Sequence, residues 1–184
     1  MAFPNRNFYM ELSDKVNTLL QEANVFEPPV PIKNIAVNWG ARVLPYELGE
    51  EVSGILVYDN YKGTIGYNSS NHRVRQRFTI AHELGHLIYH VSDNSGKEMF
   101  VDKDFIIKFR SEKDYSPKEI RQEREANAFA AFILMPKQFI FSEIKKSKYK
   151  ELSETEVIEE FAKLFDVSIP AMTYRFADLN ISSY

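Results

Sequence analysis

The sequence contains no cysteine, which excludes disulfide bonds and thiolate zinc sites. Any metal ion must therefore be held by histidine and carboxylate side chains. The sequence also lacks an apolar run of membrane-spanning length, and residues 1–20 have neither a basic start nor an unbroken apolar stretch. We therefore predict a cytoplasmic protein without a signal peptide.

An excess of charge of one sign is absent as well. The net charge is −3 and the acidic and basic residues are interspersed, so the sequence gives no electrostatic footprint for nucleic acid. Of the 184 residues, 44% are hydrophobic, which is enough for one domain with a sizeable core.

Hydrophobic periodicity and turn signals predict helices around a small sheet. Ser116 and Glu119 form a capping box that opens a long helix, and Pro136 ends it. The other expected helices span residues 8–23, 31–39, 71–90, 153–165 and 169–178. Strands are expected at residues 42–46, 54–58 and 64–67, with strand character also at 99–109. The predicted fold class is α+β, with a small, mostly antiparallel sheet packed on helices.

The most informative motif is His-Glu-x-x-His, formed by His82, Glu83 and His86. On a helix, residues four apart are offset by about 40° and lie roughly 6 Å apart, so both imidazoles can bind one metal ion. Glu83 lies a further step around the helix, where its carboxylate can take a proton from metal-activated water. A surface helix with two chance histidines is the alternative, but the apolar neighbours leave little polar face for it. The motif therefore indicates a metallopeptidase, with Glu83 as the general base.

A catalytic zinc site needs three protein ligands, so a further donor is required. His90 lies eight residues from His82, about 12 Å along a continuous helix, which is too far for both to bind one ion. We therefore interpret His90 as a helix-end residue and expect a carboxylate as the third ligand.

The acids of the long helix are the candidates for this third ligand. Glu125 shares a face with Phe129 and other apolar residues, where an unpaired charge would be costly and a metal ion would compensate it. Glu119 and Glu123 lie on the same helix, and an ion pair with a neighbouring arginine is the alternative interpretation of all three acids. The residues alone favour Glu125 and leave the choice open.

Three segments carry a family resemblance. They are residues 75–86 (RQRFTIAHELGH), 123–131 (EREANAFAA) and 134–136 (LMP), with shorter matches at 53–55, 65–68 and 167–168 and at Arg175. The sequence is similar in these segments, and over roughly residues 30–180, to the ImmA/IrrE family of metallo-endopeptidases. The resemblance implies a zincin-like fold. It also implies one zinc ion per chain, bound by His82, His86 and Glu125, the acid that fits the family's E-x-N-x-F-A motif. Asn127 of the same motif is expected to pack near the site or to support a ligand.

The resemblance also implies a substrate class. Members of this family typically cleave a helix-turn-helix transcriptional repressor, often encoded nearby in a mobile element or a stress-response operon. We therefore expect residues 1–184 to form one zincin-like metallopeptidase domain whose partner is such a repressor. A membrane is not expected as a partner, and nucleic acid is disfavoured by the charge. An extended substrate segment is expected to pair with an edge of the strands at residues 54–67.

Two alternative functions also fit the sequence. Residues 1–28 are expected to form an N-terminal helix, and residues 150–184 are expected to form a C-terminal helical pair. The spacing of this pair is like that of a helix-turn-helix, so the chain could be a DNA-binding regulator. Residues 151–184 hold seven acids and two bases, however, which disfavours DNA binding. A partner-binding protein that does not cleave would carry the same metal ligands. The residue that stabilises the oxyanion is left open among Tyr67, His72, Tyr174 and Arg175.

Overall fold

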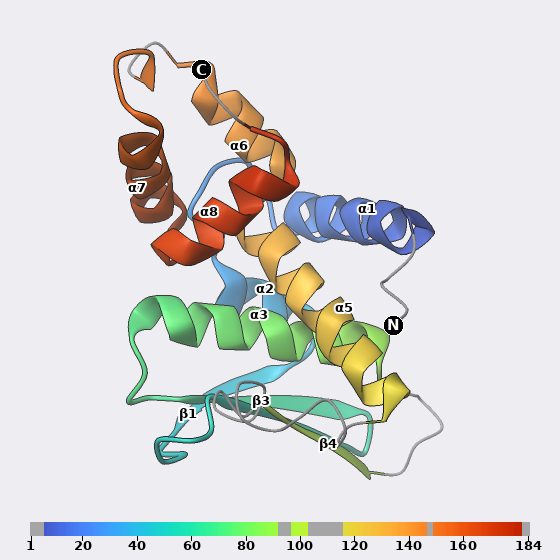
Figure 1. Ribbon diagram of the computed structural model, residues 1–184. Coiled ribbons are helices and arrows are strands. Elements are labelled where there is room, and N and C mark those ends of the chain that lie inside the picture. The colour runs from blue at the N-terminus through green and yellow to red at the C-terminus, as the bar shows by residue number, and fades with distance from the viewer. Residues whose placement is uncertain (1–5, 92–96, 103–115, 147–148, 182–184) are drawn as a thin grey trace.

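The computed structural model describes residues 6–91, 97–102, 116–146 and 149–181 of the chain. A four-stranded sheet lies on one side of a central helix, α3, and most of the other helices lie on the opposite side (Figure 1). The helices are α1 (Arg6–Glu22), α2 (Ile32–Asn38), α3 (Arg73–Tyr89), α5 (Pro117–Leu134), α6 (Lys137–Ile144), α7 (Glu154–Phe165) and α8 (Ile169–Asp178). The strands are β1 (Arg42–Tyr46), β2 (Gly54–Asp59), β3 (Lys62–Asn68) and β4 (Lys97–Asp102). The predicted α+β class is confirmed.

The sheet has the strand order β1-β3-β2-β4. β2 and β3 form an antiparallel hairpin whose two turn residues, Asn60 and Tyr61, both have positive φ, as a tight two-residue turn requires. β4 pairs antiparallel with β2, whereas β1 pairs parallel with β3. The sheet is therefore mixed, with two antiparallel pairings and one parallel pairing.

This strand order corrects the expected place of substrate pairing. β2 and β3 cover the segment that was predicted to offer a free edge, yet each is flanked by a strand on both sides. The outer strands of the described sheet are β1 and β4. Of the strand character predicted for residues 99–109, β4 accounts for the first part, and residues 103–109 lie outside the described residues.

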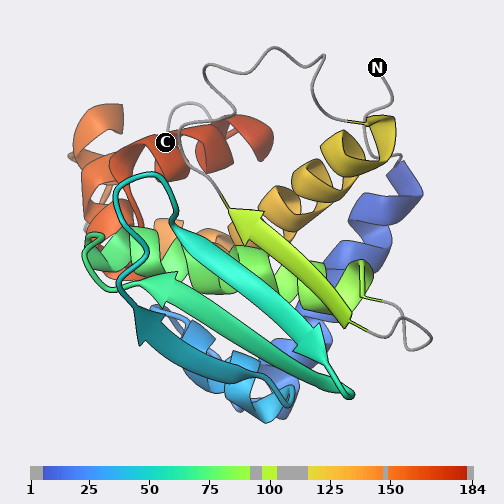
Figure 2. The ribbon, with the colours of Figure 1, turned by 90° about the horizontal axis from the view of Figure 1, so that it is seen from below.

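Helix α3 packs directly on one face of the sheet (Figure 2). Two strand glycines permit this approach. A Cβ at Gly54 would lie 2.2 Å from Cγ2 of Thr79, and one at Gly63 would lie 2.8 Å from the side chain of Leu87. Residues without a side chain at these two positions therefore let the backbone of β2 and β3 approach the motif-bearing helix closely.

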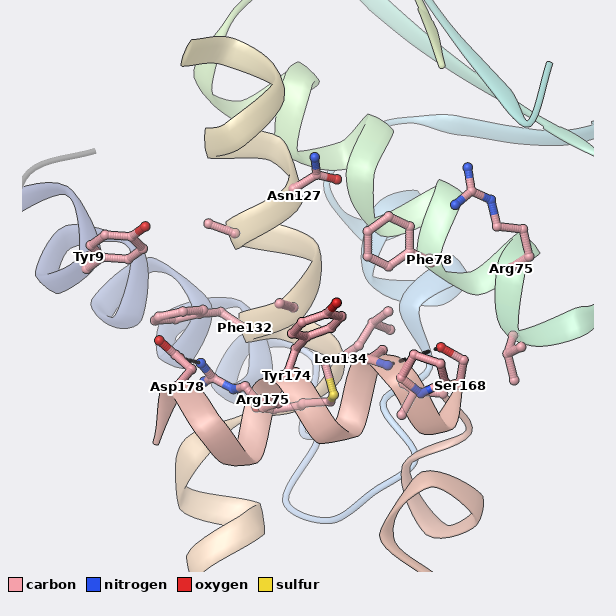
Figure 3. A pocket seen from close by; sticks show the side chains of 17 residues that line it. Tyr9, Arg75, Phe78, Asn127, Phe132, Leu134, Ser168, Tyr174, Arg175 and Asp178 are labelled. Atoms are coloured by element: carbon pink, nitrogen blue, oxygen red, sulfur yellow. Dashed lines mark hydrogen bonds and ion pairs between the residues drawn. The ribbon is translucent and has the colours of Figure 1, made fainter. Parts of the chain in front are cut away.

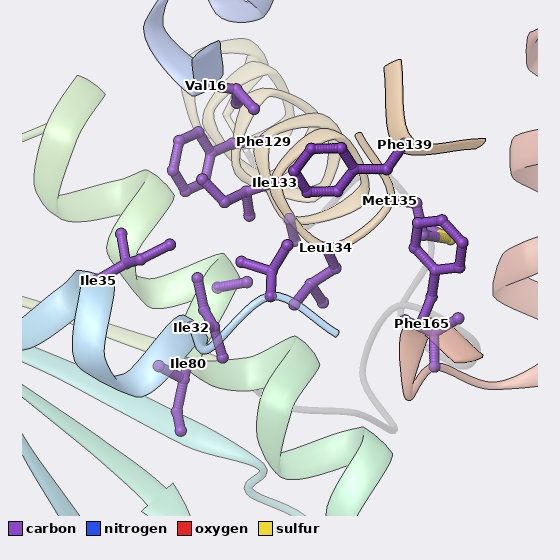
Figure 4. Close-up of a cluster of buried hydrophobic side chains, with 14 of the residues drawn as sticks. Val16, Ile32, Ile35, Ile80, Phe129, Ile133, Leu134, Met135, Phe139 and Phe165 are labelled. Atoms are coloured by element: carbon purple, nitrogen blue, oxygen red, sulfur yellow. The ribbon is translucent and has the colours of Figure 1, made fainter. Parts of the chain in front are cut away.

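Helix α5 crosses the opposite side of α3 and begins at the predicted capping box of Ser116 and Glu119. At the crossing, a Cβ on Gly85 would lie 3.2 Å from Cα of Ala126 and from the side chain of Phe129. The buried core spreads from here to α1, α2, α6 and α7 (Figure 4). The crossing is thus fixed by close packing of buried helices.

The C-terminal pair α7 and α8 packs on this helical layer. Arg77 of α3 donates to the backbone oxygens of Asp166 and Val30, and the side chain of Asp166 pairs with Arg73 and Arg77. Arg175 of α8 is 3% exposed and donates to the backbone oxygen of Met135 at the end of α5. These contacts fasten the pair to the domain.

Within the described residues, no helix is both long and apolar enough to cross a membrane.

Candidate metal centre

The crossing of α3 and α5 brings three potential metal ligands together. His82 and His86 of α3 are 2% and 1% exposed, and their Nε2 atoms lie 3.0 Å apart. The carboxylate of Glu123 on α5 lies 3.3 Å from Nε2 of His82 and 3.2 Å from Nε2 of His86. All three ligand atoms therefore point to one small volume.

These spacings fit a bound metal ion. A tetrahedral site with bonds of about 2.0–2.1 Å places its ligand atoms roughly 3.4 Å from one another. The three distances in this cluster, 3.0, 3.2 and 3.3 Å, are close to that value. Two histidines and one glutamate also form one of the ligand sets of catalytic zinc sites, in which the fourth position binds water or substrate.

The structure places Glu123, and not the expected Glu125, beside the two histidines. Glu123 and Asn127 lie one helical turn apart, so the same face of α5 presents both to α3. Glu125 points to the neighbouring His90, whose Nε2 lies 3.0 Å from its Oε2. The assignment of the third ligand stays a prediction, but these contacts shift it from Glu125 to Glu123.

Each histidine of the cluster is held at its other ring nitrogen. Nδ1 of His82 lies 3.1 Å from Oδ1 of Asn127, and Nδ1 of His86 lies 2.9 Å from Nδ1 of His90. Metal binding through Nε2 requires the proton to sit on Nδ1, which then donates to these partners. Asn127 therefore contacts a proposed ligand, as its motif position led us to expect.

His90 is more than the helix-end residue that the sequence suggested. It follows the last residue of α3, but its side chain is only 4% exposed and lies between His86 and Glu125. Arg121, one turn before Glu125, lies 3.7 Å from the same carboxylate. A chain of contacts thus leads from His86 through His90 to Glu125 and Arg121.

Burial and charge act on these groups in opposite directions. Burial lowers the pKa of His90 to about 4, although the hydrogen bond to Glu125 raises it. Burial raises the pKa of Glu123, but hydrogen bonds with His82 and His86 outweigh this and hold the pKa below its usual range. At neutral pH, His90 is therefore uncharged and can accept from His86 while donating to Glu125.

Glu83, the predicted general base, is completely buried on the sheet side of α3. Its Oε1 would lie 3.1 Å from a Cβ at Gly54, so its carboxylate lies against β2. From β4, Phe100 stacks on His86, with ring centroids 4.7 Å apart. The motif helix, β2 and β4 thus surround the cluster from the sheet side.

The four candidates for oxyanion stabilisation lie in different places. Tyr67 lines a small pocket near α2, and His72 precedes the first residue of α3. Tyr174 and Arg175 both line a larger cavity beside α5, where Tyr174 is 77% exposed and Arg175 is buried. The geometry gives no single choice among them.

That larger cavity has a volume of about 560 Å³ and lies between α3, α5 and α8 (Figure 3). Asn127 and Phe78 line it on the side of the metal cluster. Phe78 also stacks on His82, with ring centroids 6.2 Å apart. The cavity and the cluster are therefore neighbours that share a wall.

The structure defines an α+β domain with a candidate metal site formed by two histidines and a glutamate. Comparison with known families agrees: the chain belongs to the Peptidase_M78 family, whose IrrE N-terminal-like domain matches residues 38–177. The resemblance to ImmA/IrrE proteins is thereby confirmed, and membership of this family supports a metallopeptidase.

The chain is also similar to individual proteins, among them a phage protein and a mycobacterial regulator. Uncharacterized immunity region protein 2 of Bacillus phage phi105 is 27% identical over 172 residues, which cover 91% of this chain and 97% of the phage protein. A solved structure of a Mycobacterium tuberculosis transcriptional regulator matches 91% of this chain with a TM-score of 0.61 and 13% identity. The chain spans only 46% of the length of that regulator, and the likeness concerns the fold alone.

Proposed function

We propose that this protein is a zinc-dependent endopeptidase that cleaves a protein substrate at a defined bond. The observation that carries the proposal is the meeting of His82, His86 and Glu123 at the crossing of α3 and α5. The fully buried Glu83 of the same motif lies beside them on α3. Family membership supports the same class of reaction.

We assign the metal ligands to His82, His86 and Glu123. A zinc ion held there would polarise the scissile carbonyl and lower the pKa of water to about 7. Glu123 is 32% exposed, so the cluster is buried on the histidine side and open on the glutamate side. This opening suits the entry of a substrate carbonyl.

Glu83 serves as the general base in this proposal. Its carboxylate takes a proton from the attacking water and later delivers it to the nitrogen of the leaving amine. Glu83 is one residue from His82 and on the helix that carries both histidines, so its position relative to the ligands is fixed by α3. Packing of Gly54 against Thr79 and Glu83 keeps that helix in place on β2.

Asn127 and the pair formed by His90 and Glu125 orient the two imidazoles. Each accepts the Nδ1 proton of one histidine, which leaves Nε2 free to bind the ion. Glu125 thus keeps a role at the site, because it contacts His90, which in turn contacts His86. This role also explains why an acid lies on the face of α5 that carries Ala128, Phe129 and Phe132.

The substrate that we propose is a cytoplasmic helix-turn-helix repressor. The family resemblance supports this, and one relative is named for the immunity region of a phage, a mobile element in which such regulators are expected. An extended segment of the repressor would pair with β4, which among the described strands pairs with β2 alone and carries Phe100 beside His86. Residues 1–184 would act as one zincin-like domain.

Metal analysis and a cleavage assay test the proposal. We expect one zinc ion per chain after dialysis, and single-site cleavage of the repressor encoded beside the gene, with casein left intact. Glu83→Gln protein with bound zinc is the matched control and should leave the repressor whole. Digestion of casein with an intact repressor would instead favour a general peptidase.

The alternative is a regulator that binds DNA through α7 and α8. Arg175 of α8 is buried, and the acidic charge of this pair is unfavourable beside phosphates. If the zinc-loaded protein cleaves neither substrate but retards a DNA fragment in a salt-sensitive way, this alternative replaces the endopeptidase.

A further inference from the structure

The cavity between α3, α5 and α8 has no role in the chemistry proposed above. Its volume of about 560 Å³ lies within the range of typical ligand pockets, about 300–1,000 Å³. Its walls are largely apolar, and side chains of Phe78, Phe132 and Met135 contribute to them. Two of the residues that line the cavity from different helices are small, Ala131 of α5 and Ala171 of α8.

The cavity shares a wall with the metal cluster. Asn127 lines the cavity and its Oδ1 lies 3.1 Å from Nδ1 of His82. Phe78 lines the cavity and stacks on the same imidazole. Asn127 and Phe78 thus form the wall between the cavity and His82, and an occupant of the cavity lies one side chain away from a proposed ligand.

The two arginines of the cavity already have partners. The guanidinium of Arg175 lies 4.1 Å from the centroid of the Phe132 ring, donates to the backbone of Met135 and pairs with Asp178 at 2.7 Å. Arg75 donates to Oγ of Ser53 and lies 5.7 Å from the Phe78 ring. The charge of Arg175 is thus paired within the wall, and the largely apolar lining favours an apolar occupant over an anion.

We propose that this cavity binds a large apolar side chain of the protein substrate, Leu, Met or Phe, close to the scissile bond. The proposal rests on the endopeptidase function and adds the substrate feature that the site selects. Replacing that substrate residue by Ala should weaken binding by roughly 10- to 100-fold, as expected for the loss of one buried apolar side chain.

The experiment separates binding from cleavage. Random peptides displayed on phage are selected on zinc-loaded Glu83→Gln protein, and the affinity of the best peptide is then measured by fluorescence anisotropy. We expect one position of the selected peptides to hold Leu, Met or Phe. Ala171→Phe, which fills the cavity, should weaken binding at least about 10-fold. Ala177→Phe is the matched control, because residue 177 is exposed on the same helix and does not line the cavity.

Each outcome decides the proposal. It is overturned if no peptide is enriched, if the enriched peptides show no apolar preference, or if Ala171→Phe binds them as Ala177→Phe does. Ala131→Phe fills the same space from α5 and serves as the second variant if Ala171→Phe lowers the melting temperature. If wild-type protein binds the selected peptide at the cavity but never cleaves it, the endopeptidase function fails while the apolar binding site stands.

Discussion

The two sides of the α3–α5 crossing differ in chemistry although the same two helices build them. One side holds buried polar groups, and the other holds a cavity lined by Phe78, Phe132 and small residues. On the polar side, the contacts run in order from Asn127 through the histidine cluster to Glu125. On the cavity side, most of the lining is apolar, and Arg175 pairs with Asp178 and donates to the backbone of Met135.

In the proposed function, one pair of helices separates the reaction from the recognition of the substrate. Polar groups buried in a crossing must be partnered, and partnered groups are held rigidly, as a metal site requires. An apolar cavity makes weaker demands on geometry and tolerates different occupants. Asn127 lies on the border and is common to both sides. The two sides should therefore respond differently to substitution.

The largest effect is expected from Glu123→Gln on the polar side. An amide is a much weaker metal ligand than a carboxylate, so this variant should lose stoichiometric zinc and with it all cleavage. Elemental analysis after dialysis measures the zinc. The matched control is Glu125→Gln, two residues away, which should still bind one zinc ion at saturating metal. The reverse result would restore Glu125 as the ligand.

A large loss of activity without loss of metal is expected from Glu83→Gln. Gln has a similar shape but cannot accept the proton, so the rate of peptide hydrolysis should fall by at least about 10²-fold. Zinc content and the melting temperature should match those of the wild type. Cleavage at a near wild-type rate would rule out Glu83 as the base.

Much of the helical layer could be predicted from the sequence, since caps and periodicity are local signals. The capping box at Ser116 opens α5 as expected, and α7 follows Ser153 within the helix predicted for residues 153–165. The strand order could not be predicted, because β1 pairs with β3 across more than twenty residues. Hydrophobic periodicity predicts a strand but not which other strand it pairs with. Helix α6 was missed because Pro136 ends one helix and caps the next.

The polar side was predicted only in part for a similar reason. The spacing of His82 and His86 is a local signal, whereas the choice between Glu123 and Glu125 depends on how α5 crosses α3. One feature of the sequence does favour Glu123 as the ligand. Glu123 and Asn127 have the same four-residue spacing as the two histidines, so they face α3 together. Glu125 was favoured because its apolar surroundings need a charged partner, and His90 proved to contact it.

A moderate effect is expected from His90→Phe, which keeps a ring in the buried space but removes the acceptor for His86. Loss of such a partner typically weakens metal binding by about 10- to 100-fold. Competition with a chelator of known zinc affinity measures this, and the visible spectrum of the cobalt form reports any change in ligand geometry. Asn127→Leu tests the equivalent support of His82. Unchanged affinity in both variants would mean that the imidazoles need no such partners.

The smallest effect is expected from Asp178→Asn on the cavity side. The Asp178 side chain is 59% exposed, and exposed ion pairs contribute about 0–1 kcal/mol. Asn keeps an oxygen that can accept from Arg175, whose guanidinium also stays stacked on Phe132 and bonded to the backbone of Met135. Urea unfolding should therefore show a loss below about 1 kcal/mol. Zinc affinity should not change, because Asp178 lies on the side of the crossing that does not hold the ion. A fall in zinc affinity comparable to that of His90→Phe would show that the two sides are coupled through α5. It would contradict the hypothesis that one side serves the reaction and the other serves recognition.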